Sequence, residues 1–259
     1  MFRRNCITGT NCRRQDYRTY CLDRKEWIRC LAQGYLGGSL FLYFFYHHWL
    51  VLLCGIPAGI LFCRWQAKEL AKKRQKVLKC QFRDWITAVA SNLQAGYSVE
   101  NAFVKSGKDL GSLYDENTDI QKEIRQMEHL LQNNVTLERI LEDFGIRSGV
   151  PEIENFSEIF AAGKRSGGNF REIISFCCEV ISAGIDTEKE IQTMLHGKVM
   201  EQRVMCVVPF VIMLYISCTS PGYFDPLYQS PAGRIVMTVC LAVYMVSVAV
   251  SRRIVNIEV

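Results

Sequence analysis

Cysteine and histidine have the most versatile side-chain chemistry in this chain, and their spacing decides whether they can act together. The chain has 12 cysteines and 4 histidines among its 259 residues. Cys6, Cys12, Cys21 and Cys30 include no pair spaced as C-x-x-C, whereas protein zinc sites usually contain such a close pair. We therefore interpret these cysteines as reduced thiols of a cytosolic tail. A metal-dependent redox protein that uses them is the alternative.

Motifs for catalysis and phosphate binding are missing from the sequence. The string that ends at Gly163-Lys164 has Glu158 where a Walker A loop needs its first glycine. HExxH and GxSxG strings do not occur, and His129 and His196 have no nucleophile or ligand partner at helical spacing. We expect no catalytic residue, no cofactor and no metal.

Three uncharged stretches interrupt an otherwise polar chain whose mean hydropathy is only +0.04. They cover residues 35–63, 204–224 and 235–251. Stretches of this length and composition predict an integral membrane protein. The net charge of +5 is also compatible with nucleic-acid binding, but the basic residues flank the uncharged stretches. We therefore expect contact with the lipid bilayer and no nucleic-acid partner.

The basic residues also predict how the chain crosses the membrane. Residues 1–33 carry eight bases against three acids, and residues 64–83 carry eight against one. Under the positive-inside rule both flanks are cytosolic, so the stretch between them must cross twice, turning at His47-His48. Each helix of this hairpin would be only about 25 Å long, which leaves a re-entrant hairpin as the alternative.

The sequence therefore predicts a multi-pass cell-membrane protein with both termini in the cytosol. The expected spans are residues 30–46, 49–65, 204–219 and 235–250. The expected domains are a basic tail (1–29), an N-terminal transmembrane hairpin (30–65), a cytoplasmic domain (66–203), a C-terminal transmembrane hairpin (204–250) and a second tail (251–259).

The cytoplasmic domain is predicted to be helical. Apolar residues recur every three to four positions through residues 66–203, and no segment alternates with period two. The fold class is therefore an all-α membrane protein, with an antiparallel bundle of about six helices between two hairpins. The expected apolar faces include Ile159 and Val180, and Cys177-Cys178 are expected to pack in the core. The expected helix starts are Ser98, Thr136, Pro151 and Asn169, and the expected helix ends are Gly96, Asn133-Asn134, Gly145 with Gly149, and Gly167-Gly168.

One segment of this domain is strongly acidic. Residues 109–158 contain twelve acids and four bases, a net charge of −8. One interpretation is a solvated surface that stays away from anionic lipid, and the other is a docking surface for a cytosolic partner with a basic rim. The candidate docking acids are Glu138, Glu142, Asp143, Glu152 and Glu154.

Four strings of the sequence, in order, resemble the type II secretion system F family. They are LQAGYSVENAF (Leu93 to Phe103), NNVTLERILEDF (Asn133 to Phe144), FAAGKRSGGNFREII (Phe160 to Ile174) and the last hairpin, VPFVIMLYISCTSPGYFDPLYQSPAG. The layout of two hairpins around one helical domain is most similar to the tight-adherence (TadB-like) branch. The resemblance marks these structural motif residues: Leu93, Gly96, Ser98, Ala102, Phe103, Gly163, Ser166, Gly167, Gly168 and Asn169.

The resemblance implies a platform protein without enzymatic activity, which assembles a type IV-like (Flp) pilus or a related secretion filament in the inner or plasma membrane. The partners implied are a hexameric cytosolic secretion ATPase, prepilin or pilin subunits, and a second F-family protein or another copy of the chain. Lys164 and Arg165 stand where some relatives carry an acid, which disfavours a cation site there. A membrane anchor or adaptor that recruits a cytosolic partner is the alternative.

Overall fold

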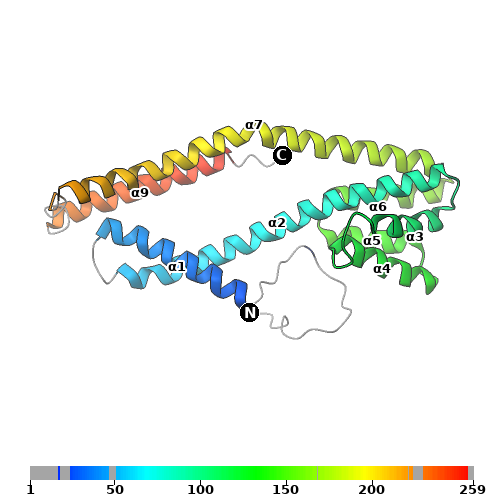
Figure 1. Ribbon diagram of the computed structural model, residues 1–259, viewed down its shortest axis with the longest axis horizontal. Helices are drawn as coiled ribbons and strands as arrows, with labels where there is room; N and C mark the ends of the chain where they lie inside the picture. Colours follow the sequence, from blue (N-terminus) through cyan, green and yellow to red (C-terminus); the bar gives the residue numbers. More distant parts are fainter. Residues whose placement is uncertain are drawn as a thin grey trace. The chain divides into compact units, whose positions relative to one another are not determined.

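The structure is a computed structural model that describes Tyr17 and residues 24–46, 51–167, 169–220, 222–223 and 230–255. All regular secondary structure in these residues is α-helical, which confirms the all-helical prediction. The chain divides into two compact units (Figure 1). The first unit comprises Met1–Leu22 and Gln66–Asp186, and the second comprises Asp23–Trp65 and Thr187–Val259.

Two of the helices are much longer than the others and contribute to both units. They are α2, with 44 residues, and α7, with 50 residues. The helices of the described residues are α1 (Arg24–Tyr46), α2 (Val51–Gln94), α3 (Val99–Leu110), α4 (Asp119–Gln132), α5 (Leu137–Ser148), α6 (Pro151–Ser166), α7 (Phe170–Thr219) and α9 (Pro231–Val255). The expected turn at His47-His48 lies outside the described residues.

Local sequence signals explain where the short helices begin and end. Gly96 has φ +95° directly after α2, and Gly149 and Gly167 have φ +62° and +68° directly after α5 and α6. Glycine lacks the Cβ that disfavours this left-handed conformation, so it ends a helix at little cost. Ser98 and Thr136 occupy the predicted N-cap positions of α3 and α5, although neither side chain makes a capping hydrogen bond.

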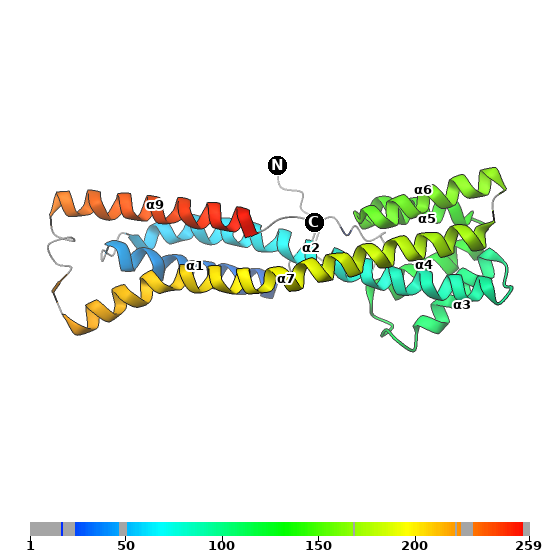
Figure 2. The same cartoon turned by 90° about the horizontal axis from the view of Figure 1, so that it is seen from above.

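The core of the first unit is built around aromatic rings. Phe82 lies with its ring centroid 5.9 Å from that of Trp85 and 5.4 Å from that of Phe156, both edge to face. The indole N–H of Trp85 donates to the hydroxyl of Ser106 over 2.9 Å, which satisfies a polar group inside the core. Leu78 of α2 and Ile174 of α7 are also fully buried, so both long helices take part in this core (Figure 2).

Three predictions about this unit are wrong. Gly145 does not end α5 but lies inside it and is buried. A Cβ there would come within 3.1 Å of the Glu154 Cα of α6, so this glycine permits the close packing of α5 on α6. Ile159 and Val180 were expected in the core but are 44% and 53% exposed. Their helices are covered over a narrower arc than the apolar pattern suggests, so the outer apolar residues stay at the surface.

Small residues bring helices of the second unit close together. A Cβ on Gly34 of α1 would lie 2.9 Å from the Phe62 ring and 3.2 Å from the Cα of Gly59, so the backbones of α1 and α2 approach closely. The phenol of Tyr244 in α9 donates to the carbonyl of Cys206 in α7 over 2.8 Å. Close approach through small residues and interhelical hydrogen bonds are typical of helices that pack in a bilayer.

In the described residues, one helix is long and apolar enough to cross a membrane, α7 (Phe170–Thr219), and a shorter apolar helix covers Ile235–Ser251. Helix α7 continues through Pro209.

Candidate partner-binding site

The first three strings of the resemblance meet in one pocket of the first unit. The pocket has a volume of about 240 Å³. Its lining comes from the start of α3, the start of α5, the end of α6 and the start of α7. The lining residues are Ser98, Val99, Glu100, Leu137, Phe160, Lys164 and Phe170. Segments about seventy positions apart in the chain therefore form one surface feature, which we call the motif pocket.

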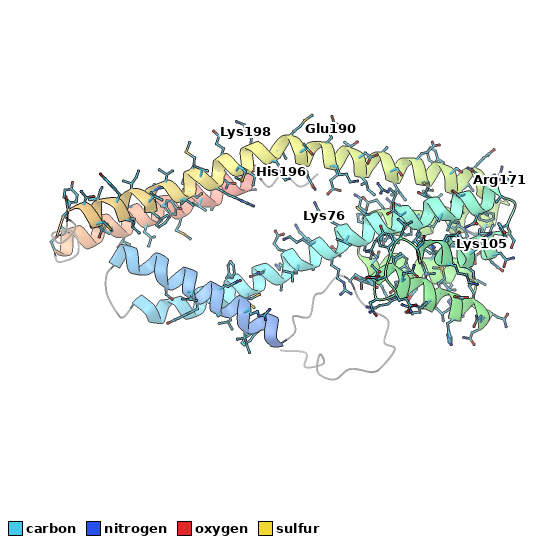
Figure 3. The ribbon with its side chains drawn as sticks, in the orientation of Figure 1. Lys76, Lys105, Arg171, Glu190, His196 and Lys198 are labelled. Carbon is cyan, nitrogen blue, oxygen red and sulfur yellow. The ribbon has the colours of Figure 1, made fainter. Side chains whose placement is uncertain are left out.

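The first string supplies both core and pocket. Leu93, Ala102 and Phe103 are buried, and Phe103 packs edge to face on Trp85 and Phe160 with centroids 5.3 and 5.8 Å apart. These residues position α3 so that its first turn lines the motif pocket. Lys105 of α3, labelled in Figure 3, lies over the Tyr97 ring at 3.9 Å and supports the loop before α3.

The third string covers the end of α6 and the start of α7. Gly163 is buried, and a Cβ there would come within 2.7 Å of Cδ1 of Ile173. The hydroxyl of Ser166 donates to the Gly163 carbonyl, and the side-chain oxygen of Asn169 accepts the backbone N–H of Arg171, labelled in Figure 3. The glycine thus permits close packing, and Asn169 caps α7 as predicted. Gly168 lies outside the described residues.

An ion pair between Lys164 and Glu138 joins α6 to α5 beside the motif pocket. Burial raises the pKa of the Glu138 carboxyl, but its hydrogen bonds to Lys164, to its own backbone and to Thr136, together with the charge of Lys164, outweigh burial, and the net pKa is lowered. Glu138 is therefore ionised at neutral pH and holds the Lys164 ammonium at the rim.

The five candidate docking acids fall into two groups in the structure. Glu138, Asp143 and Glu152 pair with basic residues of the same unit, and the Glu152 carboxylate lies 2.7 Å from the Lys79 ammonium. Glu142 is exposed on α5 and Glu154 is half-buried on α6. The negative charge that a partner would meet is thus smaller than the sequence count suggests.

A partly buried charged cluster on α2, α4 and α5 was not predicted. Arg147 donates two hydrogen bonds to Glu123, over 2.9 and 2.8 Å, and a third to Asp143 over 2.7 Å. Arg74 donates two to Asp119, over 2.6 and 2.7 Å. We call Arg74, Asp119, Glu123 and Arg147 the tyrosine socket, because Tyr17 is seated in it. The i, i+4 spacing of Asp119 and Glu123 was the signal available in the sequence.

Tyr17 contacts each side of this cluster. Its side chain is 1% exposed, its hydroxyl donates to Glu123 over 3.0 Å, and its backbone N–H donates to the Arg147 carbonyl over 3.0 Å. The Arg74 guanidinium lies 4.9 Å from the ring centroid, within range of a cation–π interaction. Burial, and next the charge of Glu123, raise the pKa of Tyr17, so the phenol keeps its proton. Burial lowers the pKa of Arg147, but Glu123 and Asp143 raise it more.

The described residues contain no group of three or more His, Cys, Asp or Glu side chains that could hold a metal ion. Burial raises the pKa of Cys177, which makes its thiol less reactive.

The regular secondary structure of the described residues is all α-helical, and one of these helices is long and apolar enough to cross a membrane. The family model for the type II secretion system (T2SS) protein F matches residues 85–217. The chain belongs to this family, whose members are non-catalytic platform proteins of type II secretion and type IV pilus systems and work with secretion ATPases and pilins. No curated protein and no solved structure matches the chain.

Proposed function

We propose that this chain is a TadB-like platform protein, which couples a cytosolic hexameric secretion ATPase to the movement of pilin subunits in a type IV-like (Flp/Tad) pilus machine. Membership of the protein F family supports the platform role. The order of the segments, an N-terminal hairpin, one helical domain and a C-terminal hairpin, supports the TadB-like branch. A second F-family protein or another copy of the chain completes the platform in this proposal.

The observation that carries the proposal is the continuity of α2 and α7. Helix α7 contributes Ile174, Cys177 and Ile181 to the core of the first unit and then continues, without a break, into the apolar residues that end at Thr219. Helix α2 runs unbroken from Val51 into the same core. A continuous helix is stiff over this length, so a displacement of the helical unit would move the membrane segments directly.

In the proposed topology the chain spans the bilayer four times, at residues 30–46, 49–65, 204–219 and 235–250. The close contact of α1 and α2 at Gly34 and the hydrogen bond from Tyr244 to Cys206 support two hairpins. The basic flanks place both termini in the cytosol in this scheme.

The proposed contact with the ATPase uses the acids of α5 and α6. Glu142 is exposed and Glu154 is half-buried, and both can meet a basic rim without breaking an ion pair seen in the structure. Charge pairs at a rim mainly steer association, so we expect this contact to weaken as salt increases.

The coupling is tested by inserting a short polyglycine segment near Lys72 of α2 or near Lys198 of α7, the latter labelled in Figure 3. Each insertion should abolish pilus assembly, because glycine interrupts the stiff connection. The matched control is the same insertion after Asn117, which is exposed in the turn between α3 and α4. Membrane insertion and protein level are measured in parallel.

Normal piliation in both helix-insertion variants would refute force transmission. It would favour the second candidate, a membrane anchor or adaptor that recruits a cytosolic partner, since recruitment tolerates a flexible link. The exposed Glu142 of α5 and the half-buried Glu154 of α6 are the observation that favours this candidate.

A further inference from the structure

We propose that the tyrosine socket is a peptide-binding site and that the N-terminal segment around Tyr17 is its intramolecular ligand. In this state Tyr17 is docked on the helical unit through its side chain and one backbone hydrogen bond. This inference goes beyond the proposed function, because it depends only on the contacts of Tyr17 with α2, α4 and α5.

The socket is held in shape by its own residues. Arg74 of α2 is fixed by two hydrogen bonds to Asp119 of α4, and Arg147 of α5 is fixed by two to Glu123 of α4. Asp143 accepts a third hydrogen bond from Arg147. None of these pairs involves Tyr17, and the helices that carry them share a core of other side chains. The site is therefore preorganised for a ligand, which lowers the entropic cost of binding.

The contacts select tyrosine. An aromatic ring is required next to the Arg74 guanidinium, and a donor is required at the far end of that ring for the Glu123 carboxylate. Phenylalanine has the ring but no hydroxyl, so it would leave Glu123, which is 6% exposed, with one hydrogen bond fewer in a buried place. The N–H that donates to the Arg147 carbonyl fixes the position of the peptide backbone.

The charge of the segment fits the surface that carries the socket. Arg13, Arg14 and Arg18 flank Tyr17 in the sequence. Residues 109–158, which include α4 and α5, have a net charge of −8, and they stay negative after three of their acids pair with Arg74, Lys79 and Lys164. Opposite charges speed association and are screened by salt, so peptide binding should weaken as ionic strength rises. The ligand is therefore a tyrosine with basic neighbours.

The binding test uses the full chain in detergent micelles and a fluorescein-labelled peptide with the sequence of residues 9–24. The Tyr17→Ala chain has an empty socket and should bind the peptide saturably in fluorescence anisotropy. The wild-type chain should bind it about tenfold more weakly or worse, because its own tail is present at high effective concentration. A Tyr17→Phe peptide should bind about tenfold more weakly, whereas a Tyr20→Phe peptide should bind like the original.

The socket is tested in the Tyr17→Ala background. Arg74→Gln removes the cation next to the ring and should weaken the binding of the peptide several-fold. Arg125→Gln changes the same residue type on the exposed side of α4 and should leave the affinity unchanged. Circular dichroism and elution volume confirm that each chain is folded.

If Tyr17→Ala does not fold, the Tyr17→Phe chain replaces it. Its internal ligand is weaker, so the added peptide should bind up to about tenfold more tightly than to the wild type, and a Tyr20→Phe chain should show no gain. The proposal is overturned if the folded variants do not bind the peptide. It is also overturned if the two tyrosines of the peptide are equivalent, or if Arg125→Gln weakens binding as much as Arg74→Gln does.

Discussion

Substituting two helical glycines by alanine should change stability in opposite directions. Gly107 lies inside α3 and Gly184 inside α7, and both belong to the first unit. Alanine is favoured over glycine in a helix interior by about 1 kcal/mol. Both substitutions have this advantage, so any difference between them must come from what the new methyl group contacts.

The surroundings of the two glycines differ sharply. At Gly184 a Cβ would meet nothing within 4 Å, so Gly184→Ala should stabilise the protein by about 1 kcal/mol. At Gly107, which is buried, a Cβ would overlap with Cγ2 of Ile124 in α4. That methyl group is attached to Cβ of a branched side chain and cannot swing away. Overpacking costs about 1–3 kcal/mol, and an overlap this deep belongs at the upper end, so Gly107→Ala should lose about 2 kcal/mol net.

Thermal unfolding of the full chain in detergent, followed by circular dichroism, measures the contrast. At about 3 °C per kcal/mol, Gly184→Ala should raise Tm by about 3 °C and Gly107→Ala should lower it by about 6 °C. In the Gly107→Ala/Ile124→Ala double variant the overlap is removed, so the change in Tm should differ from the sum of the changes caused by the two single substitutions. An equal rise in Tm for both glycine variants would show that α3 and α4 are not packed as described.

Three further predictions concern the ionisable residues of the first unit. Arg147→Ala leaves Glu123 buried without its cation and should cost about 3–5 kcal/mol in denaturant unfolding, whereas Arg125→Ala at the surface should cost less than about 1 kcal/mol. Burial and the hydrogen bond to Asp84 raise the pKa of Tyr114 to about 12. The folded chain thus keeps this proton when the unfolded chain loses it near pH 10, so stability falls from pH 10 to 12, and Tyr114→Phe should reduce that fall. Cys177, whose pKa burial raises, should react with maleimide more slowly than half-buried Cys80, as measured by mass spectrometry.

The helix boundaries could be predicted because their signals are local. A glycine with positive φ at Gly96 or Gly149 and a proline in the first turn at Pro151 act within a few residues of themselves. Gly145 was misread because the same residue type also permits close packing, and only the neighbouring helix distinguishes the two uses. The apolar period likewise indicates a helical face but not how wide an arc of that face is covered, which is why Ile159 was placed in the core.

The tyrosine socket could not be predicted, because its partners are chosen by tertiary packing. Tyr17 and Glu123 are 106 positions apart, and Arg74 and Asp119 are 45 apart. In the sequence Arg74 is one of eight bases that follow an uncharged stretch, and Glu123 is one of twelve acids in the acidic segment. The same charge counts fit a solvated surface, and only the packing of α2, α4 and α5 against one another brings four of these charges together in a partly buried cluster.

The charge pairs within the first unit change what the acidic segment can do. A buried ion pair adds little net stability compared with apolar packing, but it penalises every arrangement that separates the two charges. The Glu123–Arg147 pair, the more deeply buried pair of the tyrosine socket, therefore favours one arrangement of α4 and α5 over its alternatives, which a unit that transmits force would require. The carboxylates of Asp119, Glu123 and Asp143 are engaged in this way, so a basic partner would depend on acids at the surface such as Glu142. Glu142→Lys should then weaken ATPase binding without lowering Tm, and an unchanged affinity would place the docking surface elsewhere.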